Sequence, residues 1–198
     1  MKSIYIYGAS GHGLVVADIA RACGYDDVVF VDDGVNDYPT FEDIKNNSGI
    51  PIAFGIGSNV VRAKLYEKVQ KYGFEILSLV HPSAVVSLSA TIGKGTVIMP
   101  GVVVNAKAVI GKGVILNTSC VVEHECKIEN FVHISPKVAL AGDVKVGEFT
   151  HIGIGSQVKQ GITIGKNVTV GGGSMVIRDI EDNQKVVGVP ARIIAVCS

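Results

Sequence analysis

Residues Glu123, His124 and Glu125 place an imidazole between two carboxylates, in a stretch otherwise rich in valine, isoleucine and glycine. Histidine titrates near neutral pH and can serve as a general base, and a carboxylate on its other ring nitrogen fixes the tautomer and stabilises the imidazolium. The same triplet would also suit a metal site or a solvated surface patch. The elements that carry it must decide between these interpretations.

The chain from residue 80 onward repeats with a period of six. Every sixth residue from Val80 to Val176 is Val, Ile or Leu. A second row, four positions further on in each repeat, holds small or moderate side chains such as Ala90, Cys120 and Cys126. This period fits neither a helix nor an ordinary strand, and it is typical of a parallel β-helix. Three short strands make a coil of about 18 residues, so we expect about five coils.

The position of the triplet within this repeat favours the general base. His124 lies two residues after the inward Val122, among the positions that project outward from the coil. Cys126 is close enough in sequence for a Cys–His nucleophile, but it belongs to the second inward row, so we interpret it as a core residue. Whether Glu123 or Glu125 tunes His124 stays open.

A metal site is the rival interpretation, because His133 and His151 are 18 residues apart and would stack on successive coils. Some proteins with hexapeptide coils are zinc carbonic anhydrases with three histidine ligands. The successive spacings here, 9 residues from His124 to His133 and 18 from His133 to His151, do not resemble the close pair and distant third histidine of that family. We therefore expect no metal.

Residues 1–79 follow a different pattern, which predicts a Rossmann-like α/β domain before an all-β domain over 80–198 with a C-terminal tail. Strands are expected at "SIYIYG", "VVFVDD", "IPIAFGIG" and "EILSLV", with helices at "LVVADIARACG" and "NVVRAKLYEKVQKYG" between them. Strands that alternate with helices indicate a parallel sheet. Gly24 and Gly73 are expected to end the two helices.

The first strand-to-helix turn is rich in glycine and contains Ser10, Gly11, His12 and Gly13. Such turns grip phosphate, and an acidic pair, Asp32 and Asp33, follows about 20 residues later, where a carboxylate can bind a ribose hydroxyl. The spacing is GxxGxG rather than the GxGxxG of dinucleotide folds, which argues against NAD and favours another nucleotide. A tight turn with no ligand would have no need of His12.

Composition and charge argue against several classes of protein. Lys+Arg and Asp+Glu both total 18, so there is no electrostatic case for nucleic acid or an anionic membrane surface. The N-terminal apolar stretch is too short for a signal peptide, and no run suits membrane insertion. The four cysteines show no CxxC spacing and no disulfide framework (Cys23, Cys120, Cys126, Cys197). We expect a cytoplasmic protein.

The motifs "IYIYGASGHG", "IGSN", "NTSCVVEHEC" and "GGGSMV" occur in this order. From about residue 3 to 193 the chain resembles the two-domain hexapeptide-repeat sugar acetyltransferases of the PglD/NeuD type. Its closest resemblance is to the UDP-4-amino-sugar N-acetyltransferases of the bacillosamine pathway. That family implies a left-handed coil, acetyl-CoA as co-substrate, and a homotrimer with its sites between subunits. The motif "GVPARI" at 188–193 resembles the C-terminal turn of hexapeptide acyltransferases.

The resemblance also implies roles for individual residues. It makes His124 the catalytic base, Glu125 the group that raises its basicity, and the Gly142 N–H the oxyanion donor. It places Ser10, Gly11, His12, Gly13, Asp32, Asp33 and Gly57 at the nucleotide sugar. It places His133, Ile154 and Gly172 in the coenzyme A groove. Pro136 departs from the family pattern, in which glycine or another small residue is expected, and we expect it to alter a turn beside that groove.

From these roles the sequence predicts transfer of acetyl from acetyl-CoA to the amine of a UDP- or dTDP-linked 4-amino-4,6-dideoxy sugar, directly and without a covalent enzyme intermediate, for glycan or O-antigen assembly. Two alternatives stay open: O-acetylation of sialic acid or another sugar hydroxyl, and a non-catalytic trimer that binds nucleotide sugars. The choice among UDP, dTDP and GDP is also open.

Overall fold

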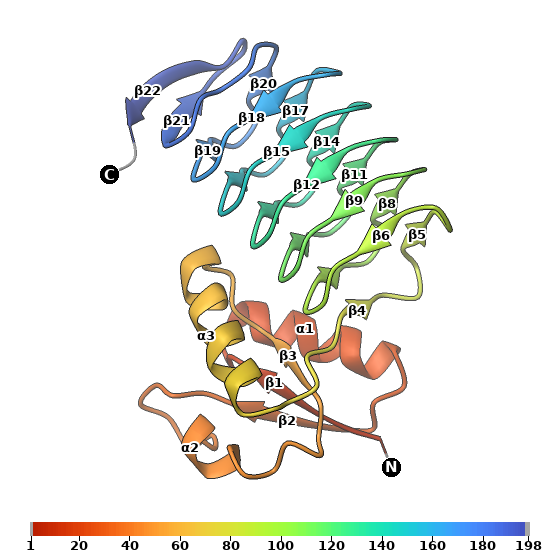
Figure 1. Ribbon diagram of the computed structural model, residues 1–198, viewed down its shortest axis with the longest axis vertical. Coiled ribbons are helices and arrows are strands. Elements are labelled where there is room, and N and C mark those ends of the chain that lie inside the picture. Colours follow the sequence, from red (N-terminus) through yellow and green to blue (C-terminus); the bar gives the residue numbers. More distant parts are fainter. Residues whose placement is uncertain (1, 197–198) are drawn as a thin grey trace.

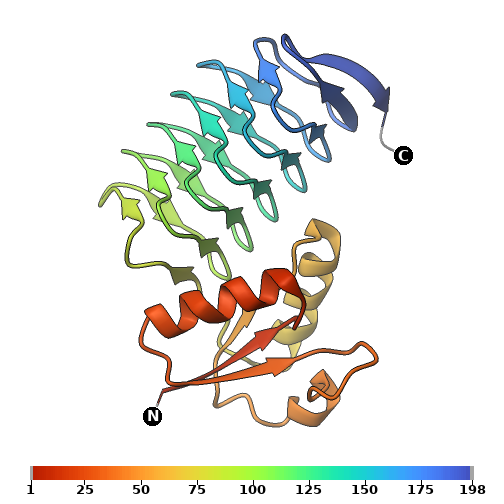
Figure 2. The ribbon, with the colours of Figure 1, turned by 180° about the vertical axis from the view of Figure 1, so that it is seen from behind.

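The computed structural model describes residues 2–196, which form an N-terminal α/β unit and a long parallel β-solenoid (Figure 1). The N-terminal unit lies against the solenoid near its first coils, and the C-terminal strands lie at the opposite end of the molecule (Figures 1 and 2). Cys197 lies outside the described residues. No helix within residues 2–196 has the length and apolar character needed to cross a membrane.

The N-terminal sheet has three parallel strands in the order β2-β1-β3. The strands are β1 (Ser3–Tyr7), β2 (Asp27–Val31) and β3 (Ile52–Phe54), and the helices are α1 (Gly11–Ala22), α2 (Phe41–Ile44) and α3 (Asn59–Lys71). Gly24 and Gly73 have positive φ just after α1 and α3, a conformation that ends helices at little cost for glycine. The first three predicted strands and the two predicted helices are present in the predicted order.

Two details of this unit differ from the prediction. The short helix α2 was not expected, although its capping box is visible in the sequence as Thr40 and Asp43, whose side chains cap each other's backbone N–H. The stretch "EILSLV" does not add a full fourth strand. Ile76 makes only an isolated bridge to Ile52, and β4 (Leu79–Val80) pairs with the solenoid instead.

The solenoid is a left-handed parallel β-helix with three faces. Face 1 contains β4, β7 (Val97–Ile98), β10 (Ile115–Leu116), β13 (His133–Ile134), β16 (His151–Ile152), β19 (Thr169–Val170), β21 (Gln184–Val187) and β22 (Arg192–Val196). Face 2 contains β5 (Val85–Val86), β8 (Val103–Val104), β11 (Val121–Val122), β14 (Ala139–Leu140), β17 (Gln157–Val158) and β20 (Met175–Val176). Face 3 contains β6 (Thr91–Ile92), β9 (Val109–Ile110), β12 (Lys127–Ile128), β15 (Lys145–Val146) and β18 (Thr163–Ile164).

The three edges between the faces are four-residue turns that recur every six residues. In the turn from Glu123 to Cys126, the Cys126 N–H donates to the Glu123 carbonyl at 3.4 Å, and Glu125 has a φ of 62°. A positive φ at the second central position is the requirement of a type II turn. The last residue of each turn points inward, which explains why the second row of the repeat is small.

The predicted inward rows form the core of the solenoid. From Ile98 to Val176 every sixth residue is buried, and so are Cys120 and Cys126 of the second row. The first coil is the exception, since Val80 is 37% exposed and Val86 and Ile92 are half-buried. No earlier coil packs on these residues, so the first inward positions of the repeat are not fully buried.

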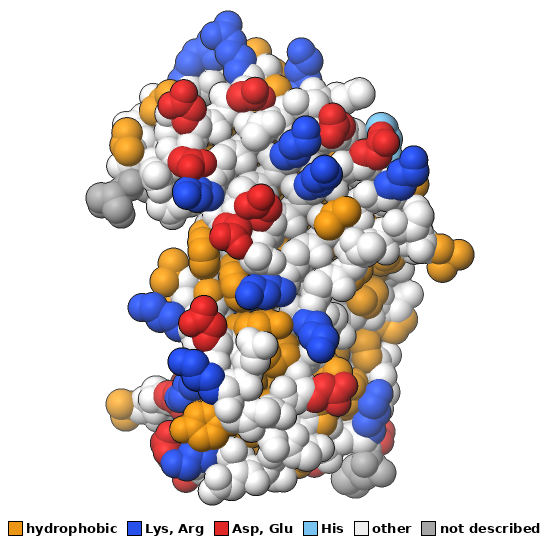
Figure 3. Space-filling view, viewed as in Figure 1, with side chains coloured by type: hydrophobic (Ala, Val, Ile, Leu, Met, Phe, Trp, Pro, Cys, Tyr) orange, Lys and Arg blue, Asp and Glu red, His pale blue; other side chains and the backbone are white. Residues whose placement is uncertain are grey.

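Aromatic packing joins the N-terminal unit to the edge between faces 3 and 1. Tyr66 of α3 meets Phe131 edge-on at 5.6 Å between ring centroids, and Phe131 stacks on Phe149 of the next coil at 5.7 Å. Elsewhere the surface is mixed in charge: lysine, arginine and acidic side chains alternate over the solenoid in Figure 3. This agrees with the balanced charge of the sequence.

Candidate active site

The turn between β11 and β12 presents the His124–Glu125 pair to solvent. The two residues occupy the central positions of the turn, and their side chains are 49% and 55% exposed. The outward position predicted from the period of six is therefore what the structure has. Glu125 has a left-handed φ without being glycine, and so do Lys107 and Asp143 at the same position of the neighbouring coils, so this conformation belongs to the turn.

The geometry separates the two glutamates. The Nδ1–H of His124 donates to Oε2 of Glu125 at 3.2 Å. Oε2 of Glu123 instead accepts from the backbone N–H of His124 at 3.3 Å and does not bond the ring. Among the described residues Nε2 of His124 has no hydrogen-bond partner, so its lone pair is free to accept a proton from a substrate.

Gly142 lies one coil beyond His124, at the same turn position. A Cβ built on Gly142 would lie 2.5 Å from both Cε1 and Nε2 of the imidazole, so only glycine leaves room for the ring in this position. The Gly142 N–H makes no backbone hydrogen bond within residues 2–196. This N–H therefore has no backbone acceptor of its own, and its role as an oxyanion donor stays a prediction.

The glycine-rich turn of the N-terminal unit places His12 and Gly13 in the first turn of α1. Ser10 is the N-cap residue but makes no side-chain capping bond, and no acidic residue lies in the first turn. The N–H groups at this helix end therefore suit a phosphate. Gly13 is needed for packing, because a Cβ there would overlap the Gly8 carbonyl oxygen.

The acidic pair at the end of β2 is engaged within the chain. Asp32 accepts from the N–H of Ala9 and of Gly34, both at 2.9 Å, and these bonds hold the pKa of its carboxyl below the usual value. Asp33 accepts from the Tyr7 hydroxyl, the Phe41 N–H and Lys68 Nζ. Burial by itself raises the pKa of Asp33, but these hydrogen bonds outweigh it and lower the value.

Three histidines form a row over face 1. The rings of His12 and His133 are 6.2 Å apart, and His133 stacks on His151 at 4.8 Å. Asn117 Oδ1 accepts from the Thr118 N–H, so its amide nitrogen donates to Nε2 of His133 at 3.1 Å and Nδ1 of that ring carries the proton. Nε2 of His12 is buried without a partner.

Burial keeps these imidazoles neutral. It lowers the pKa of His12 to about 4, and the Arg62 guanidinium adds to the effect. It lowers the pKa of His133 to about 3, with further contributions from His151 and Arg62. Neutral imidazoles can bind a polar ligand without attracting its anionic groups strongly.

Ile154 and Gly172 meet on the edge between faces 1 and 2. Ile154 is 59% exposed, and a Cβ on Gly172 would lie 3.1 Å from its side chain and 3.2 Å from its carbonyl oxygen. Pro136, on the coil before, is the first central residue of a turn whose second, Lys137, has a φ of 57°. Proline favours that position in type II turns, so the expected distortion beside this edge is absent.

One chain does not bring all the predicted residues together. His124, Glu125 and Gly142 lie on the edge between faces 2 and 3, whereas His133 lies on face 1 and faces His12. In a three-sided prism that edge is opposite face 1. The His124 group and the His12–His133 group are therefore separated by the width of the solenoid.

The rival interpretations of the site fare differently. The Cys126 thiol is buried and donates to the Ala141 carbonyl at 3.2 Å, and burial raises its pKa to about 11. A thiol of this kind is a core residue and a poor nucleophile. Within residues 2–196 no group of three or more His, Cys, Asp or Glu side chains is placed to hold a metal ion.

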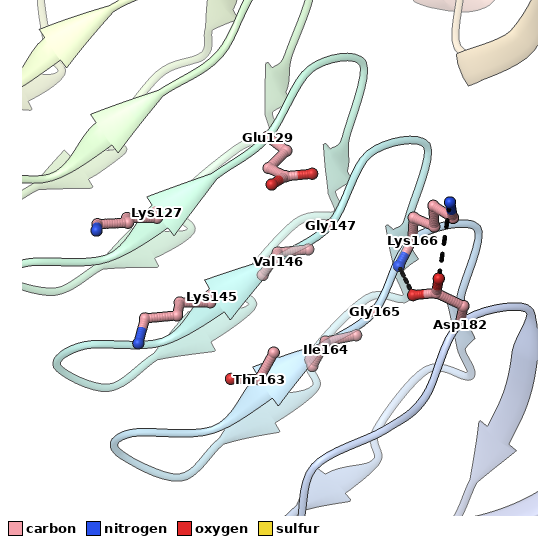
Figure 4. Close-up of a pocket in the computed structure, with 10 residues that line it drawn as sticks. All are labelled: Lys127, Glu129, Lys145, Val146, Gly147, Thr163, Ile164, Gly165, Lys166 and Asp182. Carbon is pink, nitrogen blue, oxygen red and sulfur yellow. Dashed lines mark hydrogen bonds and ion pairs between the residues drawn. The ribbon is translucent and has the colours of Figure 1, made fainter.

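A cavity of about 310 Å³ on face 3 is separate from these groups (Figure 4). Its lining includes Lys127, Lys145, Lys166 and Asp182. The Lys166 N–H donates to Asp182 at 2.9 Å, which closes one side of the cavity. It contains none of the predicted site residues.

Sequence reasoning missed Arg62 and Asn117. Arg62 occupies the buried face of α3 together with Tyr66 and Val69, a spacing at which an apolar residue is usual. An arginine on that stripe was the available signal. Asn117 lies one coil before Ser135, and its place on the edge beside His133 follows from the 18-residue coil.

Two family profiles match the chain. The PglD N-terminal domain matches residues 3–69, and the bacterial transferase hexapeptide profile (six repeats) matches residues 143–178. UDP-N-acetylbacillosamine N-acetyltransferase of Bacillus subtilis (strain 168) is 40% identical over 114 residues, which are 50% of this chain and 52% of that protein. The match thus spans about half the length of this curated relative.

Solved structures match over nearly the whole chain. The acetyltransferase domain of PglB from Neisseria gonorrhoeae FA1090 is 39% identical with a TM-score of 0.91, over 98% of this chain and 100% of that one. PerB from Caulobacter crescentus, in complex with CoA and GDP-perosamine, is 38% identical with a TM-score of 0.94, over 98% of each chain.

Fold and site together define a hexapeptide-repeat acyltransferase with an N-terminal α/β unit. The chain belongs to the PglD-type acetyltransferases within that class, and the predicted family is confirmed.

Proposed function

We propose that the protein transfers acetyl from acetyl-CoA to the amine of a nucleotide-linked 4-amino-4,6-dideoxy sugar, with UDP or dTDP as the nucleotide. The observation that carries this proposal is the His124–Glu125 pair. It presents a free Nε2 at an exposed edge, with Glu125 on Nδ1 and the backbone of Gly142 alongside. Two relatives support the acceptor class, because one is named UDP-N-acetylbacillosamine N-acetyltransferase and the other, PerB, binds CoA and GDP-perosamine.

The chemistry requires no covalent enzyme intermediate. As the acceptor nitrogen attacks the thioester carbonyl, Nε2 of His124 takes a proton from the nitrogen, and the Gly142 N–H donates to the developing oxyanion. The C–N bond forms, the C–S bond breaks, and the imidazolium returns its proton to the leaving thiolate. Glu125 stabilises the imidazolium between these steps.

The substrates would bind at the two groups of residues described above. The N–H groups at the start of α1 suit the diphosphate, with Ser10, Gly11, His12 and Gly13 in that turn and Gly57 nearby. Asp32 and Asp33 would contact the nucleoside through lone pairs not used within the chain. Ile154 and Gly172, with His133, would contact coenzyme A.

A homotrimer with shared sites would complete the arrangement, because His124 and His12 lie on opposite sides of one prism. Face 1 is covered by the N-terminal unit at its first coils, and face 3 presents Lys127 and Lys145. Face 2 has the apolar outward row, listed here with its one polar member: Val85, Val103, Val121, Ala139, Gln157 and Met175. Contact through face 2 would bring the adjoining His124 edge against the next copy.

A thiol-release assay tests the acceptor class directly. Acetyl-CoA is offered with UDP-, dTDP- and GDP-linked 4-amino sugars and with free sialic acid in parallel. We expect turnover with a nucleotide-linked amine. If only free sialic acid is turned over, the reaction is O-acetylation and the proposed N-acetylation is wrong.

A further inference from the structure

Arg62 is a buried cation at the junction of the N-terminal unit and the solenoid. Its side chain is 1% exposed, and every hydrogen-bond acceptor around it is a neutral oxygen. No carboxylate within residues 2–196 forms an ion pair with it. Burying an unpaired charge costs free energy of folding unless every donor of the group is hydrogen-bonded. We therefore look for the function of Arg62 in the groups that its hydrogen bonds hold in place.

The acceptors belong to two separate parts of the molecule. On the N-terminal side, Nη1 donates to the carbonyls of Ile56 and Gly57 at 3.0 and 3.1 Å, and Nη2 donates to Asn59 Oδ1 at 2.8 Å. On the solenoid side, Nε donates to the Gly113 carbonyl at 2.6 Å, and Nη2 donates to the Phe131 carbonyl at 3.1 Å. One planar guanidinium thus joins the loop 56–59 to two successive coils.

Asn59 extends this connection to a third coil. Its Nδ2 donates to the carbonyls of Phe149 and Thr150 at 2.8 and 3.2 Å. Since Oδ1 of the same amide accepts from Arg62, the orientation of the amide is set at both ends. Asn59 and Arg62 therefore act as one unit between the loop and the edge between faces 3 and 1.

The segments held by Arg62 carry residues of both predicted binding sites. Gly57, whose carbonyl accepts from Arg62, belongs to the nucleotide-sugar group. Val132, whose carbonyl lies 3.4 Å from Nη2, directly precedes His133 of the coenzyme A group. The charged and titratable groups that face His133 are Arg62, His12 and His151.

We propose that Arg62 is a positioning residue that fixes the loop 56–59 against the coil carrying His133, and so holds the nucleotide sugar in register with acetyl-CoA. The proposal rests on the proposed function. It differs from a general stabilising role, because it requires a larger effect on the nucleotide sugar than on acetyl-CoA. Residues 56–59 are joined to the solenoid through Arg62 and Asn59, whereas the strand of His133 is also held by pairing with β10 and β16. Ile154 and Gly172 lie on another edge and make no contact with Arg62.

The test compares Arg62→Lys, which keeps the charge but loses the planar fork, with Asn59→Ala, which leaves Arg62 in place but breaks its link to the third coil. Arg21→Lys is the matched control, because Arg21 is an exposed residue paired only with Asp18. Both KM values and kcat are measured for the nucleotide sugar and for acetyl-CoA. Small displacements of a bound substrate cost up to about 10²-fold in rate.

We expect Arg62→Lys to raise KM for the nucleotide sugar roughly 10-fold or more, with KM for acetyl-CoA within about 2-fold, and Asn59→Ala to act in the same direction more weakly. If both KM values stay at wild-type levels in both variants, or rise equally, the positioning role is wrong. If Arg62→Lys does not fold, Asn59→Ala decides between these outcomes.

A second measurement separates this proposal from the proposed function. Amide exchange of residues 56–59 and the ring-proton chemical shifts of His133 and His12 are compared at pH 7.5 in wild type and in Asn59→Ala. We expect faster exchange in residues 56–59 and a changed chemical shift of the His133 ring in the variant, even if no amino sugar is turned over by the wild type. Unchanged exchange and unchanged ring shifts would overturn the positioning role, whatever the acceptor proves to be.

Discussion

Gly142 faces the His124 ring so closely that a Cβ on the glycine would lie 2.5 Å from Nε2. This relationship joins two residues of one chain that are 18 positions apart, one full coil. It brings Nε2 of His124, which has no hydrogen-bond partner within residues 2–196, against the backbone of Gly142.

Gly142→Ala should therefore lower kcat by displacing the imidazole, by roughly 10- to 10²-fold, since a misplaced base loses most of its effect. The backbone at Gly142 does not have the left-handed φ of the turn glycines, so folding should be retained. Gly49→Ala is the control, because a Cβ there meets nothing within 4 Å. Equal kcat values for the two variants would show that the ring is not held by Gly142.

His124→Ala should reduce turnover by roughly 10²- to 10⁴-fold, the usual contribution of a general base. His81→Ala is the matched control, because His81 is half-buried and its ring bonds only the neighbouring Ser83. Steady-state rates of thiol release give the comparison. Wild-type turnover in the His124 variant would rule out the mechanism and favour a non-catalytic trimer.

Glu125→Gln and Glu123→Gln form a matched pair, because both keep side-chain shape and remove one charge from the same turn. Only Glu125 bonds Nδ1 of His124. We expect a loss of roughly 10- to 10²-fold in kcat for Glu125→Gln, less than for a buried orienting carboxylate because Glu125 is half exposed, and little change for Glu123→Gln. The reverse order would assign the tuning role to Glu123.

The period of six explains why so much of the solenoid could be predicted. A strictly repeated pattern determines which residues face inward, so the burial of Cys126 and the exposure of His124 follow from position alone. The choice between Glu123 and Glu125 could not be predicted in this way, because it depends on the torsion angles of one turn. Glu125 occupies its second central position, and that position directs its carboxylate to the ring.

The contacts between the N-terminal unit and the solenoid could not be predicted from the sequence, for a different reason. Arg62 donates hydrogen bonds to the backbone carbonyls of Gly113 and Phe131. Every residue has a backbone carbonyl, so the residue types do not show which positions accept these bonds. The separation of His124 from His12 likewise depends on which face of the prism receives the N-terminal unit. Neither fact is contained in a local pattern.

Cys126→Ala should leave kcat nearly unchanged, because the thiol is buried and its raised pKa keeps it protonated. The small loss of packing should lower the free energy of unfolding by about 1 kcal/mol. Thiol-release rates and denaturant unfolding measure the two effects separately. Complete loss of activity in a folded variant would identify Cys126 as a nucleophile.

Stability should fall as the pH drops below about 6.5, because the row of histidines over face 1 is buried in its neutral form. Burial lowers the pKa of His12 to about 4 and that of His133 to about 3, whereas histidine in an unfolded chain titrates near 6.5. Between these values the unfolded chain binds more protons than the folded one, so acidification favours unfolding.

The measurement is the midpoint of thermal unfolding at pH 7.5, 6 and 5, above the range in which Asp32 and Asp33 would contribute. His12→Asn should make the midpoint less dependent on pH, and His81→Asn should not, since His81 is only half-buried and its ring bonds Ser83 outside the histidine row. A midpoint in the wild type that does not change from pH 7.5 to pH 5 would mean that the histidine row is already protonated, or open to solvent, in the folded protein.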